Sequence, residues 1–173
     1  MQVAYIVPSS PVLIGRVISK FDFSRPRVIV EFGPGEGCHT RELARRMHPE
    51  SRLLTFELDP EFTRHLRREF ADDPRVEIIH ADAAEVRAHL EQRGHAHCDY
   101  VVSGIPFSTM DPEKKRALLQ EVHAVLSPEP HSAFIIYQVT NELLGHTGHF
   151  AGSVSEYCLA NVPPMFVTVY YKN

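Results

Sequence analysis

Long apolar runs are absent from the chain, and none approaches the roughly 20 residues that a membrane-spanning helix needs. The first residues, MQVAYIVPSSPVLIG, have no basic start and are interrupted by Pro8 and Pro11, so we expect no signal peptide. Cysteine is scarce as well: Cys38, Cys98 and Cys158 form no motif, and an odd number of scattered cysteines is typical of reduced thiols. We therefore expect a cytoplasmic protein without a transmembrane segment.

An excess of positive charge is also missing. The 18 Lys and Arg residues are outnumbered by 22 Asp and Glu residues, which gives a net charge of -4. Proteins that bind nucleic acid through many phosphates usually have a basic surface, so this balance argues against such a partner. Arg64, Arg67 and Arg68 form a local basic group, which is more often a solvated helix face.

Linkers, internal repeats and low-complexity stretches are absent too, so the 173 residues are expected to form a single domain, 1–173. Ser9, Ser10 and Pro11 are typical of a helix start, and the apolar spacing that follows predicts a helix there. Further helices are expected at about 40–47, 60–70, 83–92 and 112–126. Strands are expected at 27–32, 53–57, 76–79, 100–103, 133–139, 154–161 and 165–171.

Strands that alternate with helices predict an α/β fold with a Rossmann-like, doubly wound sheet. The sheet is expected to be seven-stranded and mostly parallel. The last two strands are joined by the short connection 162–164, so they should form a hairpin that adds an antiparallel edge at the C-terminus.

A glycine cluster, EFGPGEG, follows the first predicted strand over residues 31–37. Glycines at such a place permit a tight turn and let a ligand lie against bare backbone. The spacing is G-x-G-x-G, and Cys38 occupies the position where the dinucleotide-binding fingerprint has its third glycine. No Gly-Lys-Ser/Thr follows, which excludes a P-loop.

Acidic residues stand at the ends of the next two predicted strands. Glu57 comes about 20 residues after the glycines, where a ribose-hydroxyl acceptor is expected, and Asp82 in HADAAE is placed for an adenine amine. Ligands of open α/β sheets bind at the carboxyl ends of strands, so together these residues favour an adenosine ligand without a pyrophosphate. Taken singly, Glu57 could be a solvated strand end, Asp82 a helix cap and the glycines a plain turn.

The motifs EFGPGEG, FELD, HADA and SGIPF resemble those of class I S-adenosylmethionine-dependent methyltransferases. The stretches VPSSP, SGIPFS and NVPPMFVTVYY are similar, more narrowly, to those of bacterial phospholipid N-methyltransferases, and the resemblance covers nearly the whole chain. It implies methylation of the amine of phosphatidylethanolamine toward phosphatidylcholine, with S-adenosyl-L-homocysteine as the second product. It also implies a phospholipid partner at the inner face of the membrane, no nucleic acid and no obligate protein partner.

Carried over onto this chain, the resemblance assigns each motif a role. The cofactor loop is matched by Glu31, Gly33, Gly35 and Gly37, the ribose acceptor by Glu57 with Leu58 beside it, and the adenine edge by Asp82 and Ala83. The strand end beside the methyl group is matched by Ser103, Ile105, Pro106 and Phe107. The turn at Ser9 and Ser10, within an N-terminal segment 1–22, is expected to cover the cofactor.

The chain also departs from that family. Its members usually carry an amphipathic helix ahead of VPSSP that sits on the membrane, whereas Met1 here lies only a few residues before this motif. Either the sequence has been trimmed or this member docks by other means. The helix expected after Gln138 is reduced to NELLGHTGHF.

At SGIPF a buried strand stops without a polar side chain fit for chemistry. Methyl transfer to an amine requires alignment more than acid or base groups, and the main-chain carbonyls of Ser103 and Ile105 can accept the hydrogens of a neutral amine. Pro106 stiffens the turn, and Phe107 could hold a methylated ammonium by a cation–π contact. The alternative is a structural turn with a core phenylalanine.

Donors for a headgroup phosphate are less clearly marked, and the candidates are Tyr5, Tyr137, His146 and His149. The pairs His146-x-x-His149 and His95-x-His97-Cys98 lack a full ligand set, so we expect no metal site.

Two other functions remain open. An rRNA adenine N6-dimethyltransferase-like enzyme would also methylate an amine beside a related turn. The acidic net charge, the missing basic C-terminal domain and the absence of Asn before Gly104 argue against it. A cofactor-binding module without activity would bind S-adenosylmethionine and transfer no methyl group.

Overall fold

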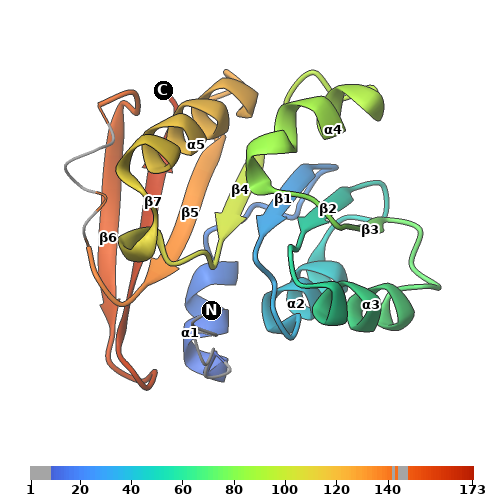
Figure 1. The fold of residues 1–173 in the computed structure, drawn as a ribbon, viewed down its shortest axis with the longest axis horizontal. Helices are drawn as coiled ribbons and strands as arrows, with labels where there is room; N and C mark the ends of the chain where they lie inside the picture. Colours follow the sequence, from blue (N-terminus) through green and yellow to red (C-terminus); the bar gives the residue numbers. More distant parts are fainter. Residues whose placement is uncertain (1–8, 142, 144–147) are drawn as a thin grey trace.

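The computed structural model describes residues 9–141, 143 and 148–173 (Figure 1). Its helices are α1 (Pro11–Ile18), α2 (Cys38–Arg46), α3 (Pro60–Glu69), α4 (Val86–Gln92) and α5 (Pro112–Val125), with short 3₁₀ turns η1 (Ala83–Glu85) and η2 (Phe107–Thr109). Its strands are β1 (Val28–Phe32), β2 (Arg52–Phe56), β3 (Val76–Ile79), β4 (Tyr100–Ser103), β5 (Ala133–Gln138), β6 (Gly152–Cys158) and β7 (Met165–Tyr171). Of the predicted elements, the helix expected over 83–92 is divided into η1 and α4.

The strands form a single sheet in the order β3-β2-β1-β4-β5-β7-β6. The first five strands pair in parallel, whereas β7 pairs antiparallel with both β5 and β6. The predicted seven-stranded, mostly parallel sheet with a C-terminal antiparallel hairpin is therefore confirmed.

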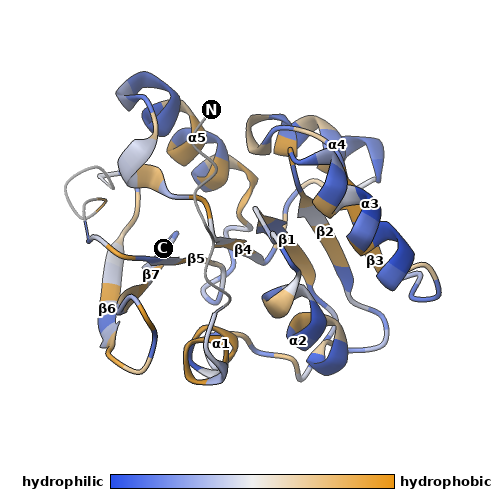
Figure 2. Ribbon diagram, turned by 60° about the horizontal axis from the view of Figure 1, so that its bottom comes forward, coloured by the Kyte–Doolittle hydropathy of each residue, from blue (hydrophilic) through white to orange (hydrophobic). Residues whose placement is uncertain are grey.

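Helices cover both faces of the sheet because alternate side chains of each strand point to opposite sides. Val30 and Phe32 of β1 join a core that includes residues of α4 and α5. Ile29, the residue before Val30, joins a second core that includes Leu13 of α1 and Leu43 of α2. Figure 2 shows these two layers, with α1 and α2 on one side of the strands and α4 and α5 on the other.

Strand direction defines two edges of the sheet that matter for the site. We call the edge where β1, β2, β4 and β5 end the carboxyl edge, and the opposite one the amino edge. Because β7 runs against β5 and β6 runs against β7, β6 points the same way as β5. The turn 159–164 between β6 and β7 therefore lies at the carboxyl edge, together with the glycine loop after β1 (Figure 1).

Candidate active site

The glycine loop between β1 and α2 takes a backbone conformation that other residues rarely adopt. Gly33, Gly35 and Gly37 have φ values of 64°, 55° and 82°, and such left-handed conformations favour glycine. A Cβ added at Gly37 would lie 2.5 Å from a methyl carbon of Leu66. At these three glycines the loop thus presents bare backbone, which is what close approach of a ligand requires.

Glu31, the last residue but one of β1, is buried beneath this loop with 1% exposure. Its Oε2 accepts hydrogen bonds from the hydroxyls of Thr40 at 2.7 Å and Thr55 at 3.2 Å. Within the part of the chain that the structure describes, its Oε1 has no partner. Burial raises the pKa of the Glu31 carboxyl to about 7. A buried carboxyl oxygen without a partner is suited to a cationic group of a ligand.

Glu57 follows β2 and joins two segments of the carboxyl edge. Its Oε2 accepts a hydrogen bond from the backbone N–H of Gly35 at 3.1 Å, and its Oε1 accepts one from Asp59 at 2.9 Å. The carboxylate therefore braces the glycine loop. Its predicted contact with a ribose stays a prediction, and Leu58 beside it is exposed.

Asp82 begins η1 as a helix cap, one of the alternatives that the sequence left open. Its Oδ1 accepts a hydrogen bond from Ala84 N at 2.9 Å, and the Glu85 side chain accepts one from Asp82 N at 3.1 Å. This reciprocal pair is a capping box. Ala83 is buried in the core. Contact of either residue with an adenine remains a prediction.

The turn after β4 lies directly against the glycine loop. Gly104 N donates a hydrogen bond to Phe32 O at 3.0 Å. A Cβ added at Gly104 would lie 3.0 Å from Gly33 O and 2.4 Å from the hydroxyl of Tyr137. Ser103 is buried, and its hydroxyl oxygen accepts a hydrogen bond from Ile105 N at 3.2 Å. Only a residue without a side chain fits where these two loops meet.

Beyond Gly104 the backbone turns into η2. The carbonyl of Pro106 accepts hydrogen bonds from Thr109 N at 3.2 Å and Thr109 Oγ1 at 3.0 Å. Phe107 is 1% exposed, and its ring packs edge-on against Phe134 with centroids 6.1 Å apart. The ring thus faces the core, and the expected contact of Phe107 with a methylated ammonium stays a prediction. The alternative, a core phenylalanine, describes it.

A buried aromatic pair that the sequence analysis missed lies beside this turn. His39 of α2 stacks on Tyr137 of β5 with ring centroids 4.3 Å apart. His39 is 2% exposed, burial lowers its pKa to about 4, and within the described residues its Nε2 has no partner. Burial, and secondarily the charge of Glu31, raise the pKa of the Tyr137 hydroxyl. The signal available in the sequence was the spacing of His39 and Leu43, which places both on one helix face.

The other predicted site residues belong to the N-terminal segment and to the segment after β5. Ser10 caps α1, as predicted: its hydroxyl oxygen accepts a hydrogen bond from Leu13 N at 3.2 Å. Whether it and Ser9 cover a cofactor stays a prediction. Tyr5 and His146 lie outside the described residues.

The structure places His149 at the opposite edge of the sheet from the glycine loop, and its contact with a headgroup stays a prediction. Ala151 N, two residues later, donates a hydrogen bond to Tyr171 O at 3.0 Å, and Tyr171 pairs with Ala133, the first residue of β5. His149 therefore lies toward the amino edge, where its ring is 6.1 Å from that of His123. Because β6 runs in the same direction as β5, its start lies at the amino edge, and His149 is only three residues before it.

Comparison with known proteins shows which family this chain is similar to. A family model described as a methyltransferase domain matches residues 29–129. An ornithine lipid N-methyltransferase of Singulisphaera acidiphila is 36% identical over 126 residues, which are 73% of this chain and 66% of that protein. An rRNA adenine N-6-methyltransferase of Aeromicrobium erythreum is 42% identical over 72 residues, which are 42% of this chain and 20% of that protein. The chain thus spans less than two thirds of the length of these curated relatives.

Solved structures show the same fold at low identity. A precorrin-6y C5,15-methyltransferase from Geobacter metallireducens superposes with a TM-score of 0.71 at 16% identity, over 100% of this chain and 94% of that one. A putative rRNA methylase from Clostridium thermocellum gives a TM-score of 0.68 at 15% identity, over 97% and 99% of the two chains. Some of the similar proteins are named for action on rRNA. The comparisons therefore give no support to the prediction that the chain has no nucleic-acid partner.

Proposed function

Because the chain belongs to the methyltransferase domain family, whose members use S-adenosylmethionine, we propose that it methylates the amine of a membrane lipid. The substrates proposed are phosphatidylethanolamine and its methylated intermediates, on the way to phosphatidylcholine. The ornithine lipid N-methyltransferase supports a lipid amine as the acceptor, since its name describes methyl transfer to a lipid nitrogen.

The residues present fit the cofactor. The orphaned Oε1 of buried Glu31 is suited to its ammonium group, and the bare backbone of Gly33 and Gly35 permits its close approach. We propose that the Glu57 carboxylate, which already braces the loop, accepts a ribose hydroxyl as well. When bound, the cofactor supplies an electrophilic methyl group on a sulfonium.

The observation that carries the proposal is the contact between the glycine loop and the uncharged turn after β4. Gly104 lies against Gly33, and no side chain of residues 103–107 carries a charge. Since the carbonyl of Pro106 is engaged by Thr109, the carbonyls of Ser103 and Ile105 are the proposed acceptors for the hydrogens of the amine. Holding a neutral amine in line can contribute roughly 7–11 kcal/mol in favourable cases.

Where the chain acts is also a proposal. Among the described residues, no helix combines the length and the apolar character that crossing a bilayer would require. We propose that the protein works from the cytoplasm as a peripheral protein at the inner face of the membrane, since that is where its substrate amine would be exposed.

Labelled S-adenosylmethionine tests the proposal directly. The protein is incubated with phosphatidylethanolamine in vesicles and in detergent micelles, and with ornithine lipid and rRNA in parallel, and each product is analysed for label. We expect mono-, di- and trimethylated phosphatidylethanolamine. Label in rRNA alone would support the second candidate, which the partial match to the rRNA adenine enzyme favours. Bound cofactor without any labelled acceptor would indicate an inactive module.

A pair of glycine variants provides the matched control for this assay. Gly104→Ala should abolish methyl transfer, because the new Cβ would lie 2.4 Å from the Tyr137 hydroxyl and 3.0 Å from Gly33 O. Gly152→Ala, at the start of β6, meets nothing within 4 Å and should retain full activity. Equal activity of both variants would contradict the placement of the acceptor beside Gly104.

A further inference from the structure

Large apolar side chains that the fold leaves exposed gather around the turn between β6 and β7. Leu159 and Val162, within the turn, are 73% and 78% exposed. Further exposed apolar residues lie at the end of β6, directly after β5 and at the start of α1. We call this set the apolar rim: Val12, Val139, Tyr157, Leu159 and Val162.

The turn is tied to the start of α1. Asn161, which is buried, accepts a hydrogen bond from Ser10 N at its Oδ1 at 2.8 Å and donates one from Nδ2 to Pro163 O at 2.8 Å. Val12 is two residues beyond Ser10. The two segments that carry most of the apolar rim are therefore held together by one buried amide side chain.

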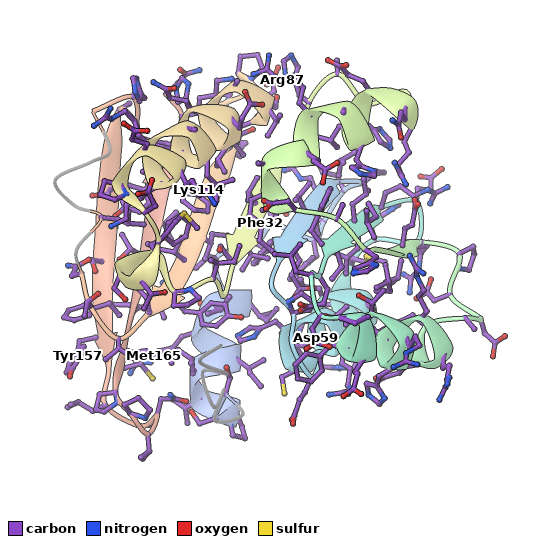
Figure 3. The ribbon with its side chains drawn as sticks, in the orientation of Figure 1. Phe32, Asp59, Arg87, Lys114, Tyr157 and Met165 are labelled. Carbon is purple, nitrogen blue, oxygen red and sulfur yellow. The ribbon has the colours of Figure 1, made fainter. Side chains whose placement is uncertain are left out.

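The apolar rim lies at the same edge of the sheet as the candidate site. The turn joins the end of β6 to the start of β7, which is the carboxyl edge, and Val139 follows β5 at that edge. In Figure 3, Tyr157 and Met165, at the end of the hairpin, and Asp59, which follows β2, lie at similar heights in the lower part of the view, where the carboxyl edge is. A surface bound by the rim would therefore be close to the level of the glycine loop.

Charge around the rim fits an anionic lipid surface. Residues 157–171 carry no charged side chain at all. Beside them, Arg16 and Lys20 both pair with Glu156, at 3.8 Å and 2.6 Å, so two cations face one carboxylate. Tyrosine and basic side chains flanking an exposed apolar tip are typical of segments that sit in the bilayer interface. In a chain with a net charge of -4, this local surplus of positive charge stands out.

We propose that the apolar rim docks on the surface of an anionic phospholipid bilayer and brings the site to the level of the lipid headgroups. This rests on the proposed lipid substrate. A second copy of the chain is the other possible occupant. It would be expected to pair along the exposed edge of β6, yet the most exposed apolar side chains lie on the turn and not on that strand, and Glu156 places a charge on it.

Single-tryptophan variants test the docking without interference, because the chain contains no tryptophan. Val162→Trp is compared with Val154→Trp, which replaces a residue 60% exposed in the middle of β6 and several residues from the turn. On addition of phosphatidylethanolamine/phosphatidylglycerol vesicles, the emission at position 162 should shift to shorter wavelength and become shielded from acrylamide. The emission at 154 should not change. No change at 162 would overturn the proposal.

A charged pair in the turn gives a second readout. Leu159→Asp/Val162→Asp should lose vesicle co-sedimentation by roughly tenfold or more, while Val154→Asp should keep it. Both should still bind S-adenosyl-L-homocysteine, which shows that they fold. The proposal would be overturned if the double variant co-sedimented with vesicles as well as the wild type does. It would also be overturned if the wild type bound no vesicles and formed an oligomer that the double variant converted to monomers. That second result would indicate that a second copy of the chain covers the apolar rim.

The two proposals fail in different ways. If wild-type protein methylates phosphatidylethanolamine in micelles but position 162 does not respond to vesicles, the docking surface is wrong and the proposed function stands. If position 162 inserts but no lipid is labelled in micelles or vesicles, the docking surface stands and the proposed substrate is wrong.

Discussion

The carboxyl of Glu31 is almost completely removed from water, with 1% of the residue exposed. Its burial raises the pKa of the carboxyl from 4.5 to about 7, so the protonated form is tolerated in the folded protein and the ionised form is disfavoured. Its contribution to the free energy of unfolding is therefore fully present below about pH 4.5 and is lost as the pH rises through 7. At pH 7 and above, therefore, Glu31 adds little to stability, which agrees with a role in binding a ligand.

Glu31→Gln should remove this pH dependence. The amide oxygen can still accept from Thr40 and Thr55, but it never ionises. Relative to wild type, the variant should gain stability between pH 5 and pH 8, by at most about 3 kcal/mol. Urea unfolding at the two pH values measures this difference. If the free energy of unfolding of the variant differed from that of wild type by the same amount at pH 5 and at pH 8, Glu31 would already be ionised at pH 5.

The glycine loop allows a second test at a single position. Gly35→Val should abolish binding of S-adenosyl-L-homocysteine by calorimetry, because a branched side chain at φ 55° both strains the loop and fills the space that the ligand needs. Gly94→Val is the control: its φ of 76° imposes a similar strain, and nothing lies within 4 Å of its added Cβ. It should lose stability and keep binding. Unchanged affinity of Gly35→Val would refute the cofactor loop.

Among the elements, η2 shows how packing decides a role that residue type leaves open. An aromatic residue after a strand end can line a site or fill a core, and Phe107 fills the core against Phe134. The short turn that follows Pro106 directs the ring inward. The face toward the glycine loop is formed by the backbone of Gly104 and by Ile105, whose side chain would lie 3.2 Å from a Cβ added at Gly33.

Phe107→Ala should therefore act on stability and not on the cationic product. We expect a loss of about 3–5 kcal/mol in the free energy of unfolding. Phe107→Leu, which keeps an apolar side chain, should be milder and should retain the ratio of mono- to trimethylated lipid. Thermal unfolding and product analysis measure the two effects. A stable Phe107→Leu variant that stops after one methyl group would restore the cation–π role.

For the whole molecule, the order of the strands decides which segments share the site. β1 and β4 are neighbours in the middle of the sheet, so the glycine loop meets the turn after β4 although some 70 residues separate them. β5 lies next to β4, and this brings Tyr137 beneath Gly104 and against His39. The antiparallel pair β7 and β6 extends the sheet on the far side and places the apolar rim at the same edge.

The opposite edge provides the matching prediction. His149→Ala should leave methyl transfer unchanged and shift the free energy of unfolding by less than about 0.5 kcal/mol, since the side chain is exposed at the amino edge. Tyr137→Phe removes one hydroxyl beside Gly104 and should lower methyl transfer in the same assay. Equal losses in both variants would contradict the separation of the two edges.

The sequence by itself determined the alternation of strands and helices, the glycine loop and the acidic residues at strand ends. These features depend on periodicity and on backbone conformations that are local to the chain: Gly33, Gly35 and Gly37 have positive φ, and Glu57 and Asp82 follow their strands, as expected. Local spacing also predicted the cap at Ser10.

Only the tertiary structure decided which way Phe107 faces, at which edge His149 lies, and that His39 stacks on Tyr137. It also decided that Glu57 holds the glycine loop and that one buried Asn161 joins the C-terminal hairpin to α1. The physical reason is the same in each case. Spacing along a chain specifies the faces of one element, whereas burial and contacts between elements depend on the order in which the strands pair.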